Sequence, residues 1–172
     1  LSSCASRQLE EVTFRRTVIP VQELLDAAGK YFKKLMKNRP ERIELEIEPM
    51  EAKVIGDVNQ LRFLLENLID EALTVREDGV IRLQARKDNE YIRFLFTDTR
   101  REKSVEELNQ LFYPNLARMT SGEKGELRGT EYLVCKQIIR DHDEFAGRRG
   151  CRINAEPAEG GGFTVYFTIP RR

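Results

Sequence analysis

The amino-acid sequence predicts an α+β domain in which helices pack on one face of a mixed β-sheet. Some segments repeat apolar residues at helical three-to-four-residue spacing, whereas shorter segments alternate apolar and polar residues as half-buried strands do. The two kinds of segment are mixed along the chain rather than strictly alternating, which favours α+β layering. With 172 residues, 40% of them hydrophobic, the chain has enough material for one domain with one core.

The first part of the chain predicts a linker, a short strand and an amphipathic helix. Residues 1–13 are polar and weakly helical, and we assign them to the linker, with the domain itself at residues 14–172. A β-prone run follows at residues 14–19, and Pro20 suits the first turn of a helix. The helix is predicted to end near Pro40, and its apolar stripe comprises Val21, Leu24, Leu25, Ala28, Phe32, Leu35 and Met36.

The sequence of the middle of the chain predicts four strands and, between the second and third, one of the strongest helical patterns in the chain. Alternation at residues 42–48 and a short apolar run at residues 54–55 indicate two strands. Asp57 is a candidate N-cap for the next helix. Alternating runs at residues 80–86 and 91–97 indicate a hairpin. The helix between these strand pairs has an apolar stripe of Leu61, Leu64, Leu65, Leu68, Ile69 and Ala72.

The last part predicts a capped short helix, a long loop, a further helix and two closing strands. Ser104 is placed to form a capping box with the Glu three residues later. Residues 113–127 show no clear period, which indicates a long loop of the kind that is usually functional or mobile. A helix is predicted for residues 129–141, and strands for residues 152–155 and 163–169.

Bulk composition argues against several classes of partner. Lys+Arg and Asp+Glu balance at 29 each, so no overall field draws the chain to nucleic acid or to a membrane surface. Cys4, Cys135 and Cys151 match neither a disulfide framework nor a zinc pattern, which indicates a reducing, cytoplasmic setting. No apolar run reaches the roughly 18 residues of a transmembrane helix. Because the sequence begins at Leu1 without an initiator Met, we expect a longer parent protein whose other segments hold any membrane anchor.

Five sequence blocks resemble the ATP-binding domain of sensor histidine kinases, within the superfamily that also holds gyrase and the mismatch-repair ATPases. The blocks are GDVNQLRFLLENLIDEA (56–72), FTD (96–98), VEELNQLFYP (105–114), GTEYLVCKQII (129–139) and GGFTVYFTIP (161–170). The resemblance covers about residues 14–170. It implies a Bergerat-type fold, a two-layer α/β sandwich with about five mostly antiparallel strands covered on one face by about three helices.

The resemblance implies a metal and phosphate site on the helix after Asp57. In the family's asparagine box, two Asn residues four apart on one helix face reach magnesium and phosphates. Asn67 fits the first position, and Glu71 stands where the second Asn is expected. A carboxylate is a legitimate oxygen ligand for magnesium, so Asn67 and Glu71 are the candidate metal ligands.

The family's first glycine box is altered in this sequence. The resemblance assigns Asp98 to the acceptor of the adenine amino group. Thr99, Arg100 and Glu102 then occupy the positions of an Asn and two Gly residues. Both glycines of the box are therefore lost.

The second glycine box, whose backbone amides wrap the triphosphate at a helix start, is altered as well. Gly129 and Thr130 fit its beginning and are candidate nucleotide-binding residues, although Gly129 is explained equally well as a helix-start glycine. Glu131 replaces the second glycine and brings an anion to the phosphates. At about 4 Å and an effective dielectric constant of roughly 20, each phosphate charge meets about 4 kcal/mol of repulsion.

Each candidate residue also has a purely structural interpretation. Asp98 can end a strand and cap a turn, and Asn67 and Glu71 can be solvated residues beside a leucine stripe. His142, the single histidine, falls where the family often has a structural histidine, and the phosphorylated histidine belongs to a preceding dimerisation domain. Cys135 lies at an apolar helix position and is expected in the core.

We therefore hypothesise a degenerate histidine-kinase ATPase-like domain with weak or no ATP binding and no expected cofactor. Its partners would be the preceding dimerisation domain, whose last helix would end within residues 1–13, and a response regulator. Dimerisation would use only segments outside this chain. The alternative is an active kinase that binds Mg-ATP through Asp98, Asn67 and Glu71, with lid cations in place of the lost amides. A third, gyrase-like alternative lacks its general base because Phe63 stands at that position.

Overall fold

The computed structural model describes residues 13–114, 120–121, 127–128 and 130–172. Four helices lie in these residues: α2 (Val21–Met36), α3 (Val58–Ala72), α4 (Val105–Gln110) and α5 (Glu131–Phe145). The strands are β1 (Thr17–Pro20), β2 (Ile43–Ile47), β3 (Lys53–Gly56), β4 (Gly79–Asp88), β5 (Tyr91–Asp98), β6 (Thr120–Ser121), β7 (Leu127–Arg128), β8 (Ile153–Pro157) and β9 (Phe163–Pro170).

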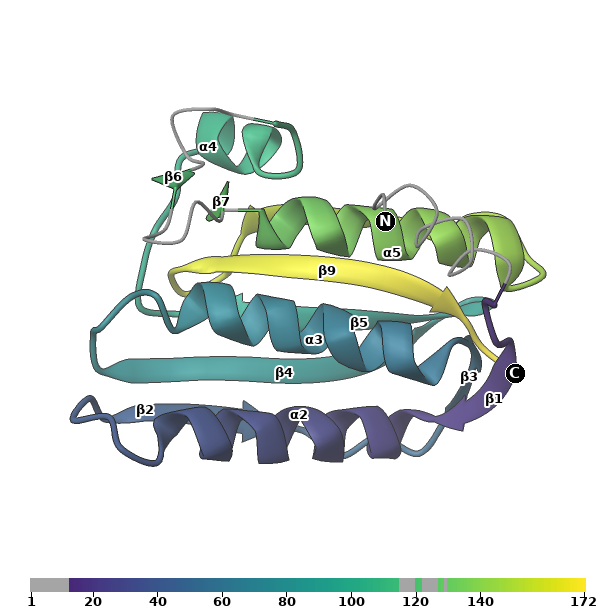
Figure 1. Cartoon of the computed structure of the whole chain (residues 1–172), viewed down its shortest axis with the longest axis horizontal. Helices are drawn as coiled ribbons and strands as arrows, with labels where there is room; N and C mark the ends of the chain where they lie inside the picture. Colours follow the sequence, from purple (N-terminus) through teal and green to yellow (C-terminus); the bar gives the residue numbers. More distant parts are fainter. Residues whose placement is uncertain (1–12, 115–119, 122–126, 129) are drawn as a thin grey trace.

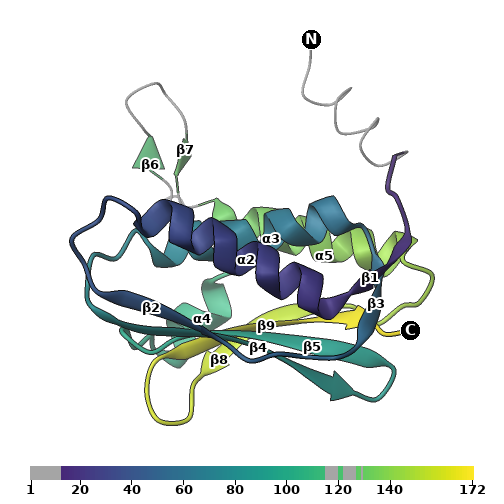
Figure 2. The same cartoon turned by 90° about the horizontal axis from the view of Figure 1, so that it is seen from below.

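The main sheet has five strands in the order β2-β4-β5-β9-β8. Strands β2 and β4 are parallel, and the other neighbours in this sheet are antiparallel. Helices α2, α3 and α5 lie side by side over one face of the sheet, as the two views of the molecule show (Figures 1 and 2). This arrangement confirms the predicted α+β class and the two-layer sandwich with a mixed, mostly antiparallel sheet.

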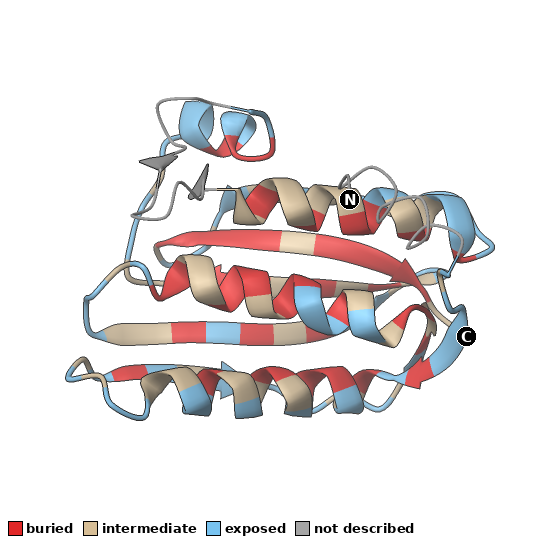
Figure 3. Cartoon of the chain, viewed as in Figure 1, coloured by how far each residue is buried: buried red, intermediate tan, exposed pale blue. Residues whose placement is uncertain are grey.

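The core lies between the helical layer and the sheet. Strand β9 is buried along almost its whole length, and the sheet-facing sides of the helices are buried opposite it (Figure 3). The rings of Phe94 on β5 and Phe167 on β9 stack with centroids 4.8 Å apart. The helical stripes of the sequence supply the facing layer, with Leu24, Leu64 and Leu65 at most 1% exposed. Strands β1 and β3 form a separate two-stranded antiparallel sheet beside this core.

The N-terminal end of α3 confirms two sequence predictions. The Asp57 side chain caps the helix by accepting hydrogen bonds from the backbone N–H groups of Asn59 (3.0 Å) and Gln60 (3.1 Å). The fully buried His142 on α5 accepts a hydrogen bond from the Asp57 N–H through Nε2, at 3.0 Å. Its Nδ1 lies 2.9 Å from the Ile138 carbonyl. His142 therefore ties α5 to α3, which confirms its structural role.

Two segments differ from the sequence prediction. The helix predicted at residues 129–141 is observed as α5, Glu131–Phe145, because Thr130 serves as its N-cap and His142 supplies a buried position beyond the predicted end. Strand β6 lies in the predicted loop at residues 113–127, and β7 begins at the last residue of that loop; the two strands pair as a two-residue antiparallel ladder. The predicted linker lies outside the described residues except for Thr13. No helix in the described ranges is long and apolar enough to cross a membrane.

Candidate functional site

A small cavity lies between α3, α5 and the ends of β5 and β9, and two of the candidate residues, Glu71 and Asp98, border it. Its free volume is about 20 Å³. That volume holds about one water molecule, whereas small-molecule sites typically measure about 300–1,000 Å³. The lining residues are Leu68, Glu71, Ala72, Val75, Phe96, Asp98, Arg101, Lys103, Tyr132, Phe163 and Val165.

Asp98, the candidate adenine acceptor, is bound by Arg100 two residues later. Its Oδ1 accepts hydrogen bonds from the Arg100 backbone N–H (3.0 Å) and from Nε (2.9 Å). Its Oδ2 accepts a hydrogen bond from Nη2 at 2.9 Å. A carboxylate offers about four acceptor positions, and Arg100 fills three of them. Asp98 is 3% exposed, so its carboxylate oxygens accept hydrogen bonds from groups of the protein and have little contact with solvent.

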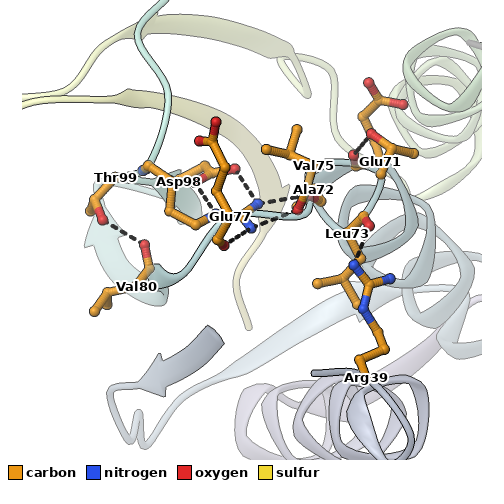
Figure 4. A network of polar contacts seen from close by, with 11 residues as sticks. Arg39, Glu71, Ala72, Leu73, Val75, Glu77, Val80, Asp98 and Thr99 are labelled. Carbon is orange, nitrogen blue, oxygen red and sulfur yellow. Dashed lines mark hydrogen bonds and ion pairs between the residues drawn. The ribbon is translucent and has the colours of Figure 1, made fainter. Parts of the chain in front are cut away.

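The Arg100 guanidinium also binds the end of α3 and the segment that follows it. Nη2 donates to the carbonyl of Ala72 at 2.6 Å, and Nη1 donates to those of Val75 and Glu77 at 3.0 Å each. Together with the two bonds to Asp98, these contacts use all five guanidinium N–H donors. We call this network the Arg100 clamp, and Figure 4 shows its contacts around Asp98, Ala72, Val75 and Glu77.

The clamp is buried and electrostatically favourable. The Arg100 and Asp98 side chains are 1% and 5% exposed. The last carbonyls of a helix lack intrahelical partners and carry partial negative charge, so a cation at this position is stabilised. Arg39 adds a second cation here, donating from Nη2 to the Leu73 carbonyl at 2.8 Å (Figure 4). At Gly79, a Cβ atom would lie 2.5 Å from the Arg100 Cγ, so the absence of a side chain makes room for the clamp.

The two candidate metal ligands point to different surroundings. Asn67 is 7% exposed, and its Nδ2 donates to the Phe63 carbonyl one turn earlier at 2.7 Å. Glu71 borders the small cavity, whereas Asn67 is not among the described residues that line it. In the described part of the chain, no group of three or more His, Cys, Asp and Glu side chains is arranged to hold a metal ion.

The start of α5 carries its own negative charge. Thr130 is the N-cap residue and makes no side-chain capping bond, and Glu131 follows in the first turn. The positive end of a helix dipole stabilises a negative charge there, so the first turn is a favourable place for the Glu131 carboxylate. The Oε1 atom of Glu131 is buried and has no hydrogen-bond partner in the described structure. Gly129, the remaining candidate, lies outside the described residues.

An aromatic side chain covers the space beside Glu131. Tyr132 is 5% exposed, lines the small cavity and packs edge-to-face on Phe112, with centroids 5.6 Å apart. Burial raises the pKa of the Tyr132 hydroxyl well above its usual value. The Tyr132 ring therefore contributes apolar contacts to the small cavity, directly after the carboxylate of Glu131 in the sequence.

The amino-acid sequence alone did not predict the roles of Arg100 and Tyr132. At position 100 the family pattern indicates only the loss of a glycine, although an Asp side chain that accepts from the backbone N–H two residues later forms a common local turn. The presence of a large aromatic residue directly after Glu131 was the available signal for a filled cavity.

Known proteins provide an independent comparison. The sequence model described as "Histidine kinase-, DNA gyrase B-, and HSP90-like ATPase" matches residues 56–172. No curated protein sequence matches the chain. The mycobacterial sensor histidine kinase MprB superposes with a TM-score of 0.70 at 18% identity, over 92% of this chain and 99% of that one.

Two structures of the histidine kinase ThkA are also similar. A nucleotide-free form of its catalytic domain gives a TM-score of 0.69 at 21% identity, over 91% of this chain and 97% of that one. The structure of ThkA in complex with the response regulator protein TrrA gives a TM-score of 0.68 at 19% identity, over 98% of this chain and 46% of that one. At these identities the likeness establishes the shared fold.

Proposed function

Because the chain belongs to the family of histidine kinase-, DNA gyrase B- and HSP90-like ATPases, we propose that it is a degenerate histidine-kinase-like domain that binds ATP weakly or not at all. It acts through contacts with its own dimerisation domain or with a response regulator, in the cytoplasmic part of a two-component signalling protein. Residues 14–172 form the domain, and residues 1–13 are the linker or the end of a preceding dimerisation helix. The Arg100 clamp on Asp98 is the observation that carries this proposal.

The clamp makes adenine binding costly. An adenine amino group that took one of the acceptor positions of Asp98 held by the Arg100 side chain would displace a guanidinium that is 1% exposed. Separating a buried ion pair so that one charge loses its partner costs about 3–5 kcal/mol. Since about 1.4 kcal/mol is tenfold in affinity, this penalty amounts to roughly two to four orders of magnitude.

The phosphate side adds a second penalty. Glu131 places a carboxylate in the first turn of α5, where a phosphate would lie, and Tyr132 fills the adjoining space. Repulsion of about 4 kcal/mol per phosphate charge at close range exceeds what a single backbone hydrogen bond returns.

Titration of the purified domain with magnesium ATP and with ADP tests the proposal. We expect no saturable binding by calorimetry up to millimolar nucleotide, while an active histidine-kinase catalytic domain binds under the same conditions. Saturable binding of either nucleotide in the micromolar range would contradict the proposal.

A gain-of-function variant sharpens this test. Arg100→Gly combined with Glu131→Gly restores two glycines of the family pattern and frees the Asp98 carboxylate. We expect measurable ADP binding in this double variant. Arg86→Gly combined with Glu159→Gly is the matched control, because it makes the same charge changes at exposed positions and should bind nothing. Circular dichroism verifies that both variants are folded.

The active kinase remains the competing function, since Glu71 and Asp98 border one cavity together with Arg101 and Lys103. In that case Mg-ATP would be held by Asp98, Asn67 and Glu71, and the phosphoryl group would pass to a histidine of a separate dimerisation domain. The protein with its dimerisation domain is incubated with γ-labelled ATP. A label on histidine establishes the kinase, whereas no label beside a working positive control supports the degenerate domain.

A further inference from the structure

Strand β2 forms a free edge of the main sheet. It ends the strand order β2-β4-β5-β9-β8, so among the described strands only β4 pairs with it (Figure 1). The Glu48 N–H donates to the Leu83 carbonyl of β4 at 3.2 Å. Alternate residues of a parallel strand bond to the same neighbour, so the backbone N–H and C=O groups of Ile43, Leu45 and Ile47 point away from β4. Such an edge is a template on which another extended segment can add as a strand.

A groove of about 750 Å³ lies beside this edge, between β2 and α2. Its apolar lining comes from Phe32, Leu45 and Ile47. Lys30 and Lys33, both exposed, line its helical wall. The volume falls within the range of about 300–1,000 Å³ that is usual for binding sites, so the groove has room for side chains of an added strand.

The opposite face of the edge strand is acidic. Glu44, Glu46 and Glu48 are exposed and alternate along the chain with Leu45 and Ile47, which pack towards the core. Successive side chains of a strand point to opposite faces of the sheet. The three carboxylates therefore line the face that α2, α3 and α5 leave uncovered (Figure 2). An added strand would meet acidic side chains on one face and the apolar groove on the other.

Strand β4 shows which neighbour these carboxylates accept. On β4, Arg82 lies opposite Glu46, and its Nε donates to the Glu46 Oε1 at 3.1 Å. Glu44 has Val80 opposite it on β4, and a valine side chain has no hydrogen-bond donor. Opposite charges that face each other across two strands are stabilising. A basic side chain on the other side of β2 would therefore give Glu44 the kind of neighbour that Glu46 already has.

The same charges argue against a second copy of the chain as the occupant. If two β2 strands paired antiparallel about a twofold axis, Glu44, Glu46 and Glu48 of one copy would face the same residues of the other. Like charges directly opposite each other are destabilising. On the groove side, Lys30 and Lys33 disfavour basic side chains, so apolar side chains fit there.

We propose that the free edge of β2 binds, as an added β-strand, an extended segment of a partner protein in which basic residues alternate with apolar ones. The basic side chains pair with Glu44 and Glu46, and the apolar side chains enter the groove beside α2. This groove and the small cavity at Asp98 are lined by different residues, so this proposal and the nucleotide titration can fail separately.

A peptide with the sequence of residues 80–86, VIRLQAR, tests the docking because it has this alternation. Its two arginines are four positions apart, as Glu44 and Glu48 are. The peptide is titrated into the isotope-labelled full chain and followed by NMR, and we expect saturable shifts of the amide signals of residues 43–47. A scrambled peptide without the alternation should bind at least about tenfold more weakly, since specificity in strand addition comes from alternate side chains.

Three outcomes of this titration would overturn the proposal. The first is no saturable binding to the unmodified chain, and the second is equal binding of the scrambled peptide, because charge alone would then explain it. The third is loss of the native signals of β5, which would show that the peptide replaces β4. Shifts at residues 43–47 on concentrating the chain without peptide would also overturn it, because the occupant is then a second copy.

Matched variants of the chain locate the contact. Glu44→Lys should raise the Kd of the peptide about fivefold, because an attractive cross-strand pair becomes a repulsive one. Glu159→Lys makes the same charge change at an exposed position between β8 and β9 and should leave the Kd unchanged. An unchanged Kd in Glu44→Lys would contradict the proposal.

A proline variant tests the backbone pairing itself. Leu45→Pro removes an N–H group that points away from β4, so the ladder between β2 and β4 is retained while the added strand loses a donor. We expect no saturable binding of the peptide to this variant, and its amide spectrum without peptide verifies the fold. Unchanged binding to the folded Leu45→Pro variant would overturn the proposal, and Glu44→Lys decides the question if Leu45→Pro does not fold.

Discussion

The two ends of α3 are held by different chemistry. At the N-terminal end, the Asp57 carboxylate accepts hydrogen bonds from three backbone N–H groups, those of Arg15, Asn59 and Gln60. At the C-terminal end, the guanidinium groups of Arg39 and Arg100 donate to backbone carbonyls. Each end thereby satisfies the backbone groups that a helix leaves unpaired, with the charge that suits its dipole.

The difference separates the scaffold from the candidate site. The N-terminal end is stabilised by Asp57 and His142, neither of which borders the small cavity. The C-terminal end is stabilised through Asp98, the residue that the family resemblance assigns to adenine. One end of the helix can therefore be weakened without affecting the site, whereas the other cannot.

Asp98→Ala should have the largest effect on stability. It leaves the Arg100 guanidinium 1% exposed without its counter-charge, and breaking such a pair costs about 3–5 kcal/mol. Urea unfolding measures the change. Glu46→Ala is the control, because its pair with Arg82 has exposures of 54% and 48% and should cost less than about 1 kcal/mol. Equal losses in the two variants would show that the clamp adds nothing to stability.

The fold was predictable because its helices and strands have clear periods. The leucine stripe of α3 and the alternation in β4 and β5 reflect burial on one face, which leaves a regular signature in the sequence. The end of α5 was predicted four residues too early. The residues added there, His142 and Phe145 among them, are stabilised by contacts with Phe14 more than 120 positions away. Such contacts have no local period.

The site was only partly predictable, for the same reason. Spacing and resemblance located Glu71 and Asp98 at one cavity. They did not reveal that Arg100 reaches the carbonyls of Ala72 and Glu77, since that contact joins segments more than 20 residues apart. A side chain that replaces a glycine can point outward or inward, and only the packing around it decides between the two.

Asp57→Ala tests the other end of α3 and should cost less than Asp98→Ala. Loss of an N-cap side chain typically costs about 0.5–2 kcal/mol of stability. We expect a loss of about 2 kcal/mol, because the backbone N–H groups of Arg15, Asn59 and Gln60 all lose their acceptor. The same urea unfolding measures it. Ser104→Ala on the six-residue helix α4 is the control and should cost about 1 kcal/mol or less. A loss in Asp57→Ala as large as that in Asp98→Ala would remove the contrast between the two ends.

The smallest expected effect is a pH dependence that belongs to the N-terminal end alone. Burial lowers the pKa of His142, and its Nε2 accepts the Asp57 N–H, so protonation would place two N–H groups against each other. In the unfolded chain a histidine titrates near about pH 6.5. Below that pH the histidine of the unfolded state binds a proton, whereas the buried imidazole of the native state resists protonation. The contribution of His142 to the free energy of unfolding is therefore complete above pH ~6.5. It falls as the pH drops below that value, by at most about 1.4 kcal/mol per pH unit.

Urea unfolding between about pH 5 and 8 measures this slope, and His142→Gln is the matched variant because it cannot titrate in that range. Its stability should be lower at neutral pH, and the slope below about pH 6.5 should shrink. His142 is the single histidine of the chain, so no second imidazole can produce the same signal. If the slope persisted in His142→Gln, the pH dependence would come from carboxylates, and the N-terminal end of α3 would be no more sensitive to protons than the rest of the molecule.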